Sequence, residues 1–170
     1  MRKLAALALA GVFCISGTAL ADEPGYYLQL GVGLAPLCGP QVCTDVPCEI
    51  DAPGFTTVHV TMIVDCHKGE GFNGVFYGLQ ESSGGTLAIH TGVVPCPEFI
   101  QAPGVPPAES GFSSAAGCID CCSAVANHAY LLLAQAPVSF NVVPHAAVGD
   151  ILVLDCNNIE VPAFCWGGAA

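Results

Sequence analysis

The segment that decides the fold is Thr57-Val58-His59-Val60-Thr61-Met62-Ile63-Val64-Asp65-Cys66. Every second residue from Val58 to Val64 is apolar, so an extended chain would present one wholly apolar face. β-Branched residues dominate the segment, and they favour strands. We therefore expect a central strand of a sheet, with Cys66 at its end placed to fasten the strand to another part of the chain by a disulfide.

The segments that follow this strand also have the pattern of strands. After a turn over 67–71, the segment 72–79 places Val75, Tyr77 and Leu79 on one side, which predicts an antiparallel partner for the central strand. A second turn, over 82–85, leads to a third expected strand over 86–94.

The remainder divides into strands and proline-rich connections. We expect a strand over 26–32, a cross-linked loop over 37–54, a proline-rich ordered loop or edge excursion over 95–111 and a short helical turn within 113–126. The last third predicts four successive strands, over 128–134, 138–143, 150–155 and 159–161. Asn157-Asn158 suits the positive φ of a tight hairpin. The fold class predicted is all-β, a single antiparallel β-sandwich of about eight strands stabilised by disulfides.

The N-terminus has the organisation of a secretory signal peptide. Residues 1–21 combine a basic start, an apolar segment shorter than a membrane span and the small-residue motif Ala19-Leu20-Ala21. We therefore expect a secreted protein, extracellular or periplasmic, whose mature domain spans 22–170. That domain holds one Lys or Arg, Lys68, against 14 Asp and Glu, a formal charge of −13. Such a domain repels phosphate backbones, which excludes nucleic acid as a partner.

The mature chain contains an even number of cysteines, and in an exported protein this indicates a disulfide framework of up to five bridges. Spacing does not determine the pairing, although the adjacent Cys121 and Cys122 are expected to reach different partners. The disulfide candidates are Cys38, Cys43, Cys48, Cys66, Cys96, Cys118, Cys121, Cys122, Cys156 and Cys165.

Three segments carry a resemblance to a known class of domain. The segments 58–64, 71–79 and 149–155 resemble the strand order of cohesin-like and carbohydrate-binding-type sandwiches of secreted bacterial proteins. The resemblance implies a β-sandwich that binds another molecule, which for a cohesin is a dockerin. The chain differs from cohesins in its ten mature cysteines and its proline-rich loop.

Two groups of residues have spacings found in metal sites. Cys118, Cys121 and Cys122 with His128 could bind zinc in a reducing compartment, but export favours disulfides. Asp155, Asn157 and Glu160 offer oxygen ligands for calcium, yet they lack the glycine and the distal glutamate of an EF-hand loop, so a plain hairpin turn is the preferred interpretation. No other cofactor is expected.

Catalytic motifs are absent from the sequence. His67 beside Asp65, with Ser82, Ser83 or Ser110, contains the residue types of a triad, but no Gly-x-Ser-x-Gly elbow accompanies them. His59 and His90 lie within strand patterns, where structural roles are commoner.

Two binding functions remain. A low content of charged residues and the expected cross-links favour a non-enzymatic structural or protein-interaction module of the cell exterior. Such a module contacts other extracellular proteins or copies of itself and does not insert into membranes. The alternative is a carbohydrate-binding module, with Trp166, Tyr26 and Tyr27 as ligand contacts and Tyr77 and Tyr130 as further aromatic candidates. A secreted hydrolase is the third hypothesis.

Overall fold

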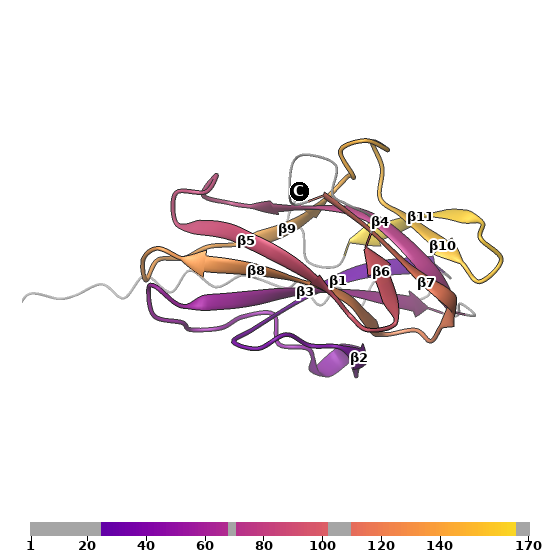
Figure 1. Cartoon of the computed structure of the whole chain (residues 1–170), viewed down its shortest axis with the longest axis horizontal. Helices are drawn as coiled ribbons and strands as arrows, with labels where there is room; N and C mark the ends of the chain where they lie inside the picture. Colours follow the sequence, from indigo (N-terminus) through magenta and orange to yellow (C-terminus); the bar gives the residue numbers. More distant parts are fainter. Residues whose placement is uncertain (1–24, 68–70, 102–109, 166–170) are drawn as a thin grey trace, which may run out of the picture.

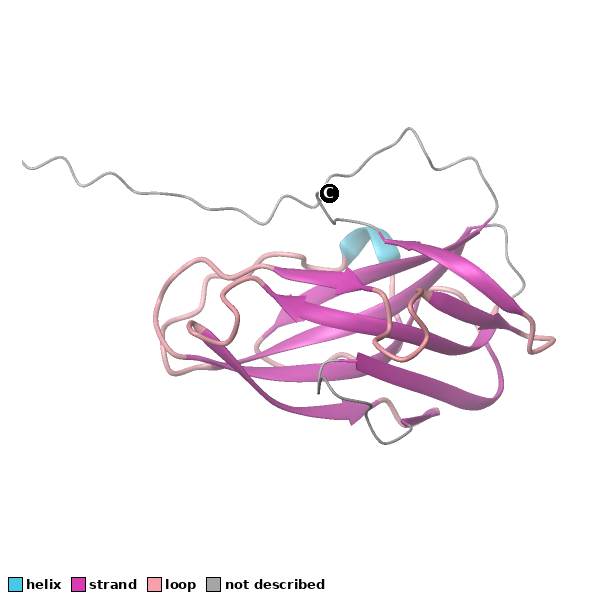
Figure 2. Cartoon of the chain, turned by 90° about the horizontal axis from the view of Figure 1, so that it is seen from above, coloured by secondary structure: helices cyan, strands magenta, loops and turns pink. Residues whose placement is uncertain are grey.

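The computed structural model describes residues 25–67, 71–101 and 110–165. The predicted signal peptide lies outside these ranges. The strands run along the long axis of the molecule (Figures 1 and 2). They are β1 (Gly25–Gly33), β2 (Gly39–Pro40), β3 (Thr57–His67), β4 (Phe72–Glu81), β5 (Ala88–Pro95), β6 (Phe99–Gln101), β7 (Ser110–Ile119), β8 (Ser123–Leu132), β9 (Phe140–Val143), β10 (Leu152–Asp155) and β11 (Glu160–Cys165). One short 3-10 helix, η1 (Cys43–Asp45), interrupts the loop before β3.

The strands form one curled sheet with two halves packed face to face. Sheet A is the half with the strand order β5-β8-β3-β1, and β2 also pairs with β8. Sheet B is the half with the strand order β10-β4-β7-β6, and β9 also pairs with β4. β11 joins the halves, because it pairs in parallel with β1 and antiparallel with β10. The expected class, an all-β sandwich with disulfides, is confirmed. The described strands number eleven, more than the eight or so expected, because the short strands β2 and β6 lie in proline-rich segments and β7 lies where a loop and a helical turn are expected.

β3 has the central position that its sequence predicts. It pairs with β1 on one side and with β8 on the other. Val58, Val60, Met62 and Val64 are almost completely buried in the core between the sheets. Thr61 and Ile63, on the opposite face, are also buried, which simple alternation does not predict.

The loop between β1 and β3 buries this second face. Val46 of the loop packs directly onto β1 at Gly31, where there is no side chain. A Cβ atom built on Gly31 would lie only 2.7 Å from Cγ1 of Val46. Asn127 holds the loop from β8: its Oδ1 accepts hydrogen bonds from the Leu37 amide at 3.0 Å and from the Thr61 hydroxyl at 2.6 Å. Its Nδ2 donates to the Leu37 carbonyl at 2.8 Å.

Two sequence-based expectations are wrong. β4 is not the antiparallel partner of β3, because the chain crosses from sheet A to sheet B between them, and β4 pairs with β7, β9 and β10 instead. The short helical turn expected within 113–126 is also absent, since β7 and β8 occupy almost all of that segment. The first error arises because local pattern does not specify which strands pair. The second arises because the small residues of β7 show no alternation of apolar and polar side chains.

Four disulfides lie towards one end of the sandwich. The bridges are Cys38–Cys96, Cys43–Cys122, Cys66–Cys121 and Cys118–Cys156. The first attaches the loop before β3 to the β5–β6 connection, and the other three attach that loop, the end of β3 and the β10–β11 turn to the end of β7 and the β7–β8 connection. Cys121 and Cys122 reach different partners, as predicted. Cys48 is a free thiol, and the side chain of Cys165 lies outside the described residues.

Within the part of the chain that the structure describes, no helix is long and apolar enough to cross a membrane.

Candidate interaction surface

The histidine of the zinc candidate lies in the core. The His128 ring is fully buried, and its Nε2 lies 2.8 Å from the Tyr77 hydroxyl. Its Nδ1 lies 3.3 Å from Nε2 of His90. Burial, reinforced by the neighbouring His90, lowers the pKa of His128 to about 3, so the ring is neutral at pH 7. The three cysteines of the same motif enter three separate disulfides. The structure therefore does not bring the proposed zinc ligands together, and no metal-binding cluster occurs among the described residues.

The residues of the proposed catalytic triad are far apart. Ser83 lies in the turn before β5, where its Oγ accepts a hydrogen bond from the Leu87 amide. The carbonyl of Leu87 in turn accepts a hydrogen bond from the amide of Leu133, the residue that follows β8. This end of β8 lies beside the start of β3, because Thr57 pairs with Leu131. Asp65 lies eight residues further along β3. At roughly 3.3 Å per residue the separation is on the order of 26 Å, which rules out a shared catalytic site.

Ser82 lies in the same turn as Ser83, and its Oγ accepts a hydrogen bond from the Ser139 amide. The side chain of Ser110 is outside the described residues. Burial raises the pKa of Asp65, an effect that the neighbouring His67 reduces. This pair is a local contact at the end of β3.

The calcium candidates surround the β10–β11 hairpin turn. Asp155 Oδ1 accepts hydrogen bonds from the amides of Asn157 and Ile159, both at 2.8 Å, and these bonds lower the pKa of the carboxyl group. Asn158 has φ of 64°, the positive value expected for this turn. The Asp155 carboxylate thus stabilises the turn itself, and Glu160 is exposed beside it. A calcium site here stays a prediction.

The tyrosines considered as sugar contacts are all buried. Tyr26 donates a hydrogen bond to the Gly71 carbonyl at 2.8 Å, and Tyr27 lies against Phe164 with ring centroids 5.7 Å apart. Tyr77 and Tyr130 are in the core. Trp166 lies outside the described residues. The described tyrosine rings therefore present no flat face on which a sugar could stack.

The outer face of sheet B carries apolar side chains on β4 and β10. Val75 and Tyr77 of β4 point into the core, so Phe76 between them points outward, where it is paired with Leu152 of β10. Leu154, two residues further along β10, also points outward and lies over Gly74, where a Cβ would come within 3.0 Å of its Cδ1.

The third strand of this surface is β6, at the edge of sheet B. Phe99 points inward and stacks on Phe72, so Ile100 points outward and is 75% exposed. We refer to Phe76, Ile100, Leu152 and Leu154 as the sheet B face. One sequence signal for this face exists: in Leu152-Val153-Leu154 apolar residues occupy both sides of a strand, which is unusual where one side meets water.

The charge of the described surface has one sign. Its exposed carboxylates are Asp45, Glu49, Asp51, Glu98, Asp120, Asp150 and Glu160, and the described residues include no Lys or Arg. A shallow depression of about 190 Å³ beside the Cys118 bridge is lined by two of these acids, Glu98 and Asp120, with Pro40 and Phe99. The surface thus combines apolar area with uncompensated negative charge.

No protein-family profile matches the chain, and the search of curated proteins found no match. Solved structures do match, and they are cohesin modules. The cohesin module of a family 33 glycoside hydrolase from Clostridium perfringens is 8% identical with a TM-score of 0.57, covering 84% of this chain and 99% of that module. The second type II cohesin of an adaptor scaffoldin of Acetivibrio cellulolyticus is 8% identical with a TM-score of 0.55, covering 86% and 98%.

A third structure, the sixth cohesin from scaffoldin B of Acetivibrio cellulolyticus in complex with a dockerin, is 10% identical with a TM-score of 0.55, covering 83% and 94%. At such identities the comparison establishes the fold. The chain has a cohesin-like β-sandwich, as the sequence resemblance indicates.

Proposed function

We propose that this chain is a non-enzymatic protein-interaction module that acts at the cell exterior and contacts its partner through the sheet B face. The observation that carries the proposal is the position of Ile100, which is 75% exposed on the edge strand β6, on the same outer face of sheet B as the half-buried Phe76, Leu152 and Leu154. Apolar side chains exposed on one face are stabilised when a partner protein covers them.

The fold supports this proposal by analogy. One similar structure is a cohesin captured with a dockerin, so a sandwich of this shape can serve protein recognition. The candidate partners are dockerins and other extracellular proteins. The other support is the predicted signal peptide with the four disulfides, a combination typical of exported domains.

Polysaccharide binding and hydrolysis are less well supported. The described tyrosines are buried, and Asp65 and His67 lie at the end of β3, whereas Ser82 and Ser83 lie in the turn before β5, near the start of β3. Self-association is opposed by the formal charge of −13 on the predicted mature chain, because two copies repel each other.

Affinity capture with matched variants tests the proposal. Oxidised protein is immobilised, exposed to secreted proteins of the source organism, and the retained proteins are quantified by mass spectrometry. Ile100→Asp places a charge on the sheet B face at an exposed position that folding tolerates. Val42→Asp is the control, because Val42 is also well exposed, at 62%, but lies in the loop on the sheet A side.

We expect a protein that the wild type and Val42→Asp retain and Ile100→Asp loses. Equal retention by both variants would contradict the sheet B face, and the absence of any retained protein would contradict the interaction function.

A further inference from the structure

Phe55, immediately before β3, combines two features that rarely occur together. Its φ is 60°, in the left-handed region that disfavours residues with a bulky side chain. Its side chain is 81% exposed, the largest value among the exposed large hydrophobic residues of the described chain. The backbone strain is therefore not offset by burial of the ring.

The surrounding structure fixes this conformation. The Phe55 amide donates to the Leu132 carbonyl at 2.8 Å, and the Leu132 amide donates to the Thr56 carbonyl at 2.9 Å. Both backbone groups of Leu132 in β8 therefore bind the backbone of residues 55 and 56. On the other side, a Cβ built on Gly54 would lie 3.1 Å from Cα of Ala134. The backbone is thus held on both sides of Phe55, and it directs the exposed ring outward from a fixed position. Glycine would adopt this φ without strain, so a phenylalanine here requires an explanation other than folding.

Other apolar side chains lie at the same end of sheet A. Thr57 pairs with Leu131 of β8, which pairs with Ile89 of β5, and Ile89 is 45% exposed. Ile89 therefore lies two strands, roughly 10 Å, from the strand that Phe55 precedes. We call Phe55, Ile89 and the half-exposed Leu131, which lie at this one end of sheet A, the Phe55 patch. It belongs to sheet A and is separate from the sheet B face.

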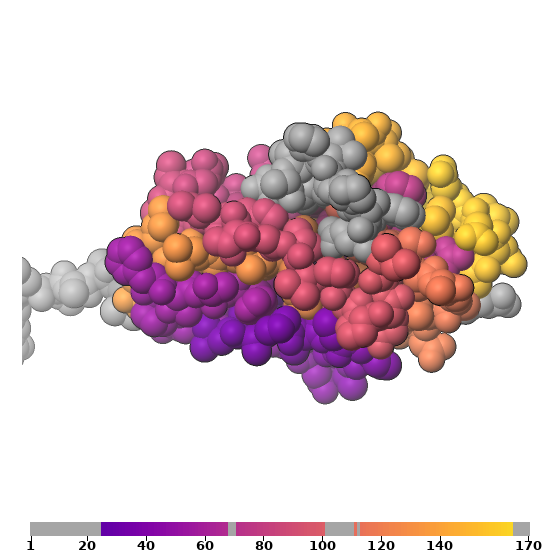
Figure 3. Space-filling view, in the orientation of Figure 1, coloured from indigo at the N-terminus to yellow at the C-terminus, as the bar shows by residue number. Residues whose placement is uncertain are grey.

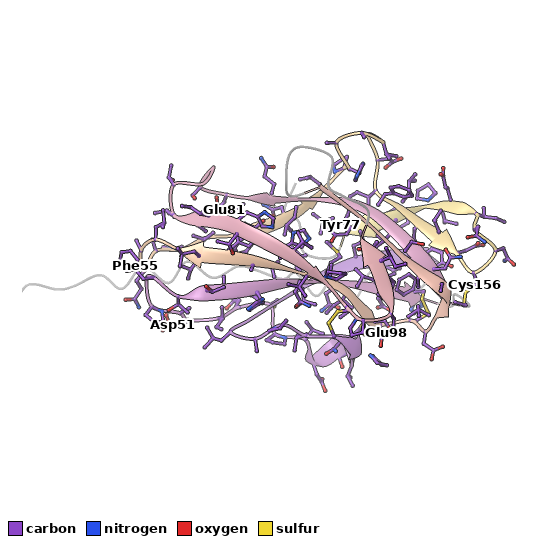
Figure 4. All side chains as sticks on the ribbon, viewed as in Figure 1. Asp51, Phe55, Tyr77, Glu81, Glu98 and Cys156 are labelled. Carbon is purple, nitrogen blue, oxygen red and sulfur yellow. A yellow bond between two sulfur atoms is a disulfide. The ribbon has the colours of Figure 1, made fainter. Side chains whose placement is uncertain are left out.

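The charges around Phe55 are all negative. Asp51 and Glu49 are exposed and precede Phe55 by four and six residues in the same loop, so Asp51 lies within roughly 14 Å of it. Figure 4 shows Asp51 and Phe55 at one end of the molecule, and Figure 3 shows the loop before β3, in purple, on the outer surface. The described residues offer no Lys or Arg to balance these acids.

We propose that the Phe55 patch is a second docking surface, on which Phe55 inserts into an apolar pocket of a partner protein whose rim carries Lys or Arg. The inference rests on the proposed protein-interaction function and adds a surface and a partner chemistry to it. An aromatic anchor on a fixed backbone loses little backbone freedom on binding, and aromatic anchors contribute much of the affinity of an interface. Asp51 and Glu49 select the cationic rim, because like charges at an interface are penalised.

The test pans a phage library of random peptides on the oxidised full domain and on three variants. Phe55→Ser removes the anchor, and Phe55→Gly removes it while relieving the backbone. Ile100→Ser is the matched control on the sheet B face. We expect enriched peptides that combine apolar residues with Lys or Arg, with binding weakened about tenfold or more by either Phe55 variant, unchanged by Ile100→Ser, and reduced by added salt.

Thermal unfolding separates binding from folding. Phe55→Gly should keep or raise the unfolding midpoint, because glycine adopts the positive φ freely. A large fall of the midpoint would show that the ring is structural and would overturn the inference. Enriched peptides that Phe55→Ser retains but Ile100→Ser loses would also overturn it, while leaving the interaction function in place. A selection that enriches no peptide would count against both.

Discussion

The Tyr77 hydroxyl and Nε2 of His128 lie 2.8 Å apart in the core and connect the two sheets, since Tyr77 belongs to β4 and His128 to β8. Both side chains are fully buried. Burial raises the pKa of Tyr77 and lowers that of His128, so both groups are held in their neutral forms. The bond has consequences for stability at acid pH.

We expect the protein to lose stability as the pH falls below 6.5. The unfolded histidine titrates near 6.5 and the folded one near 3, so in this range the unfolded state binds the extra proton. The free energy of unfolding should fall by up to about 1.4 kcal/mol per pH unit on acidification. Urea unfolding from pH 7 to pH 4, with His128→Gln as the control, measures this effect. An identical pH dependence in both proteins would contradict it.

The position of β3 predicts opposite outcomes for two adjacent substitutions. Val60→Asp places a charge in the core between the sheets and should prevent folding. His59→Ala, on the half-exposed outer face, should change stability by about 1 kcal/mol or less. Circular-dichroism melts of the two variants are the measurement, and a reversed order would refute the assignment of β3 as the central strand.

Removal of the Cys66–Cys121 bridge should be costly. It closes a loop with a sequence separation of 55 residues, for which the chain-entropy relation gives about 4 kcal/mol. Denaturant unfolding of the Cys66→Ser/Cys121→Ser double variant tests this value. Cys48→Ser, which removes the free thiol, should unfold almost as the wild type does. Peptide mapping that joins Cys66 to another cysteine would contradict the topology.

Asn127→Ala should loosen the loop between β1 and β3. The substitution removes the hydrogen bonds to Leu37 and Thr61 and leaves their buried polar groups without these partners, at a cost of about 3 kcal/mol. Limited proteolysis should then cut within 34–56 faster than in the wild type. Unchanged cleavage would show that the disulfides alone hold the loop.

The sequence predicts individual strands better than their arrangement. Alternation identifies β1, β3 and β4, because Leu28, Val60 and Val75 each fall on a buried face. It fails for the pairing of β3 with β4, because nothing local indicates that the chain changes sheets between them. It also fails for Thr61 and Ile63, which are buried only by a loop that Asn127 fixes from another strand.

The candidate surfaces were less accessible to sequence reasoning. The residues next to Phe55 in the sequence do not indicate that its side chain is exposed. Its left-handed backbone is held by a hydrogen bond to Leu132, which lies far away in the sequence. The outward position of Ile100 depends on the pairing of β6 with Ser114 of β7, inside a segment whose prolines suggest a loop. Both surfaces depend on contacts between residues distant in sequence.

The most direct test of the interaction function is hydrogen exchange of the oxidised domain, measured alone and with the protein that affinity capture retains. We predict slower amide exchange in β6 and β10, which carry Ile100, Leu152 and Leu154, when the partner is bound. Unchanged exchange across β4, β6, β7 and β10 at a saturating partner concentration would contradict the account.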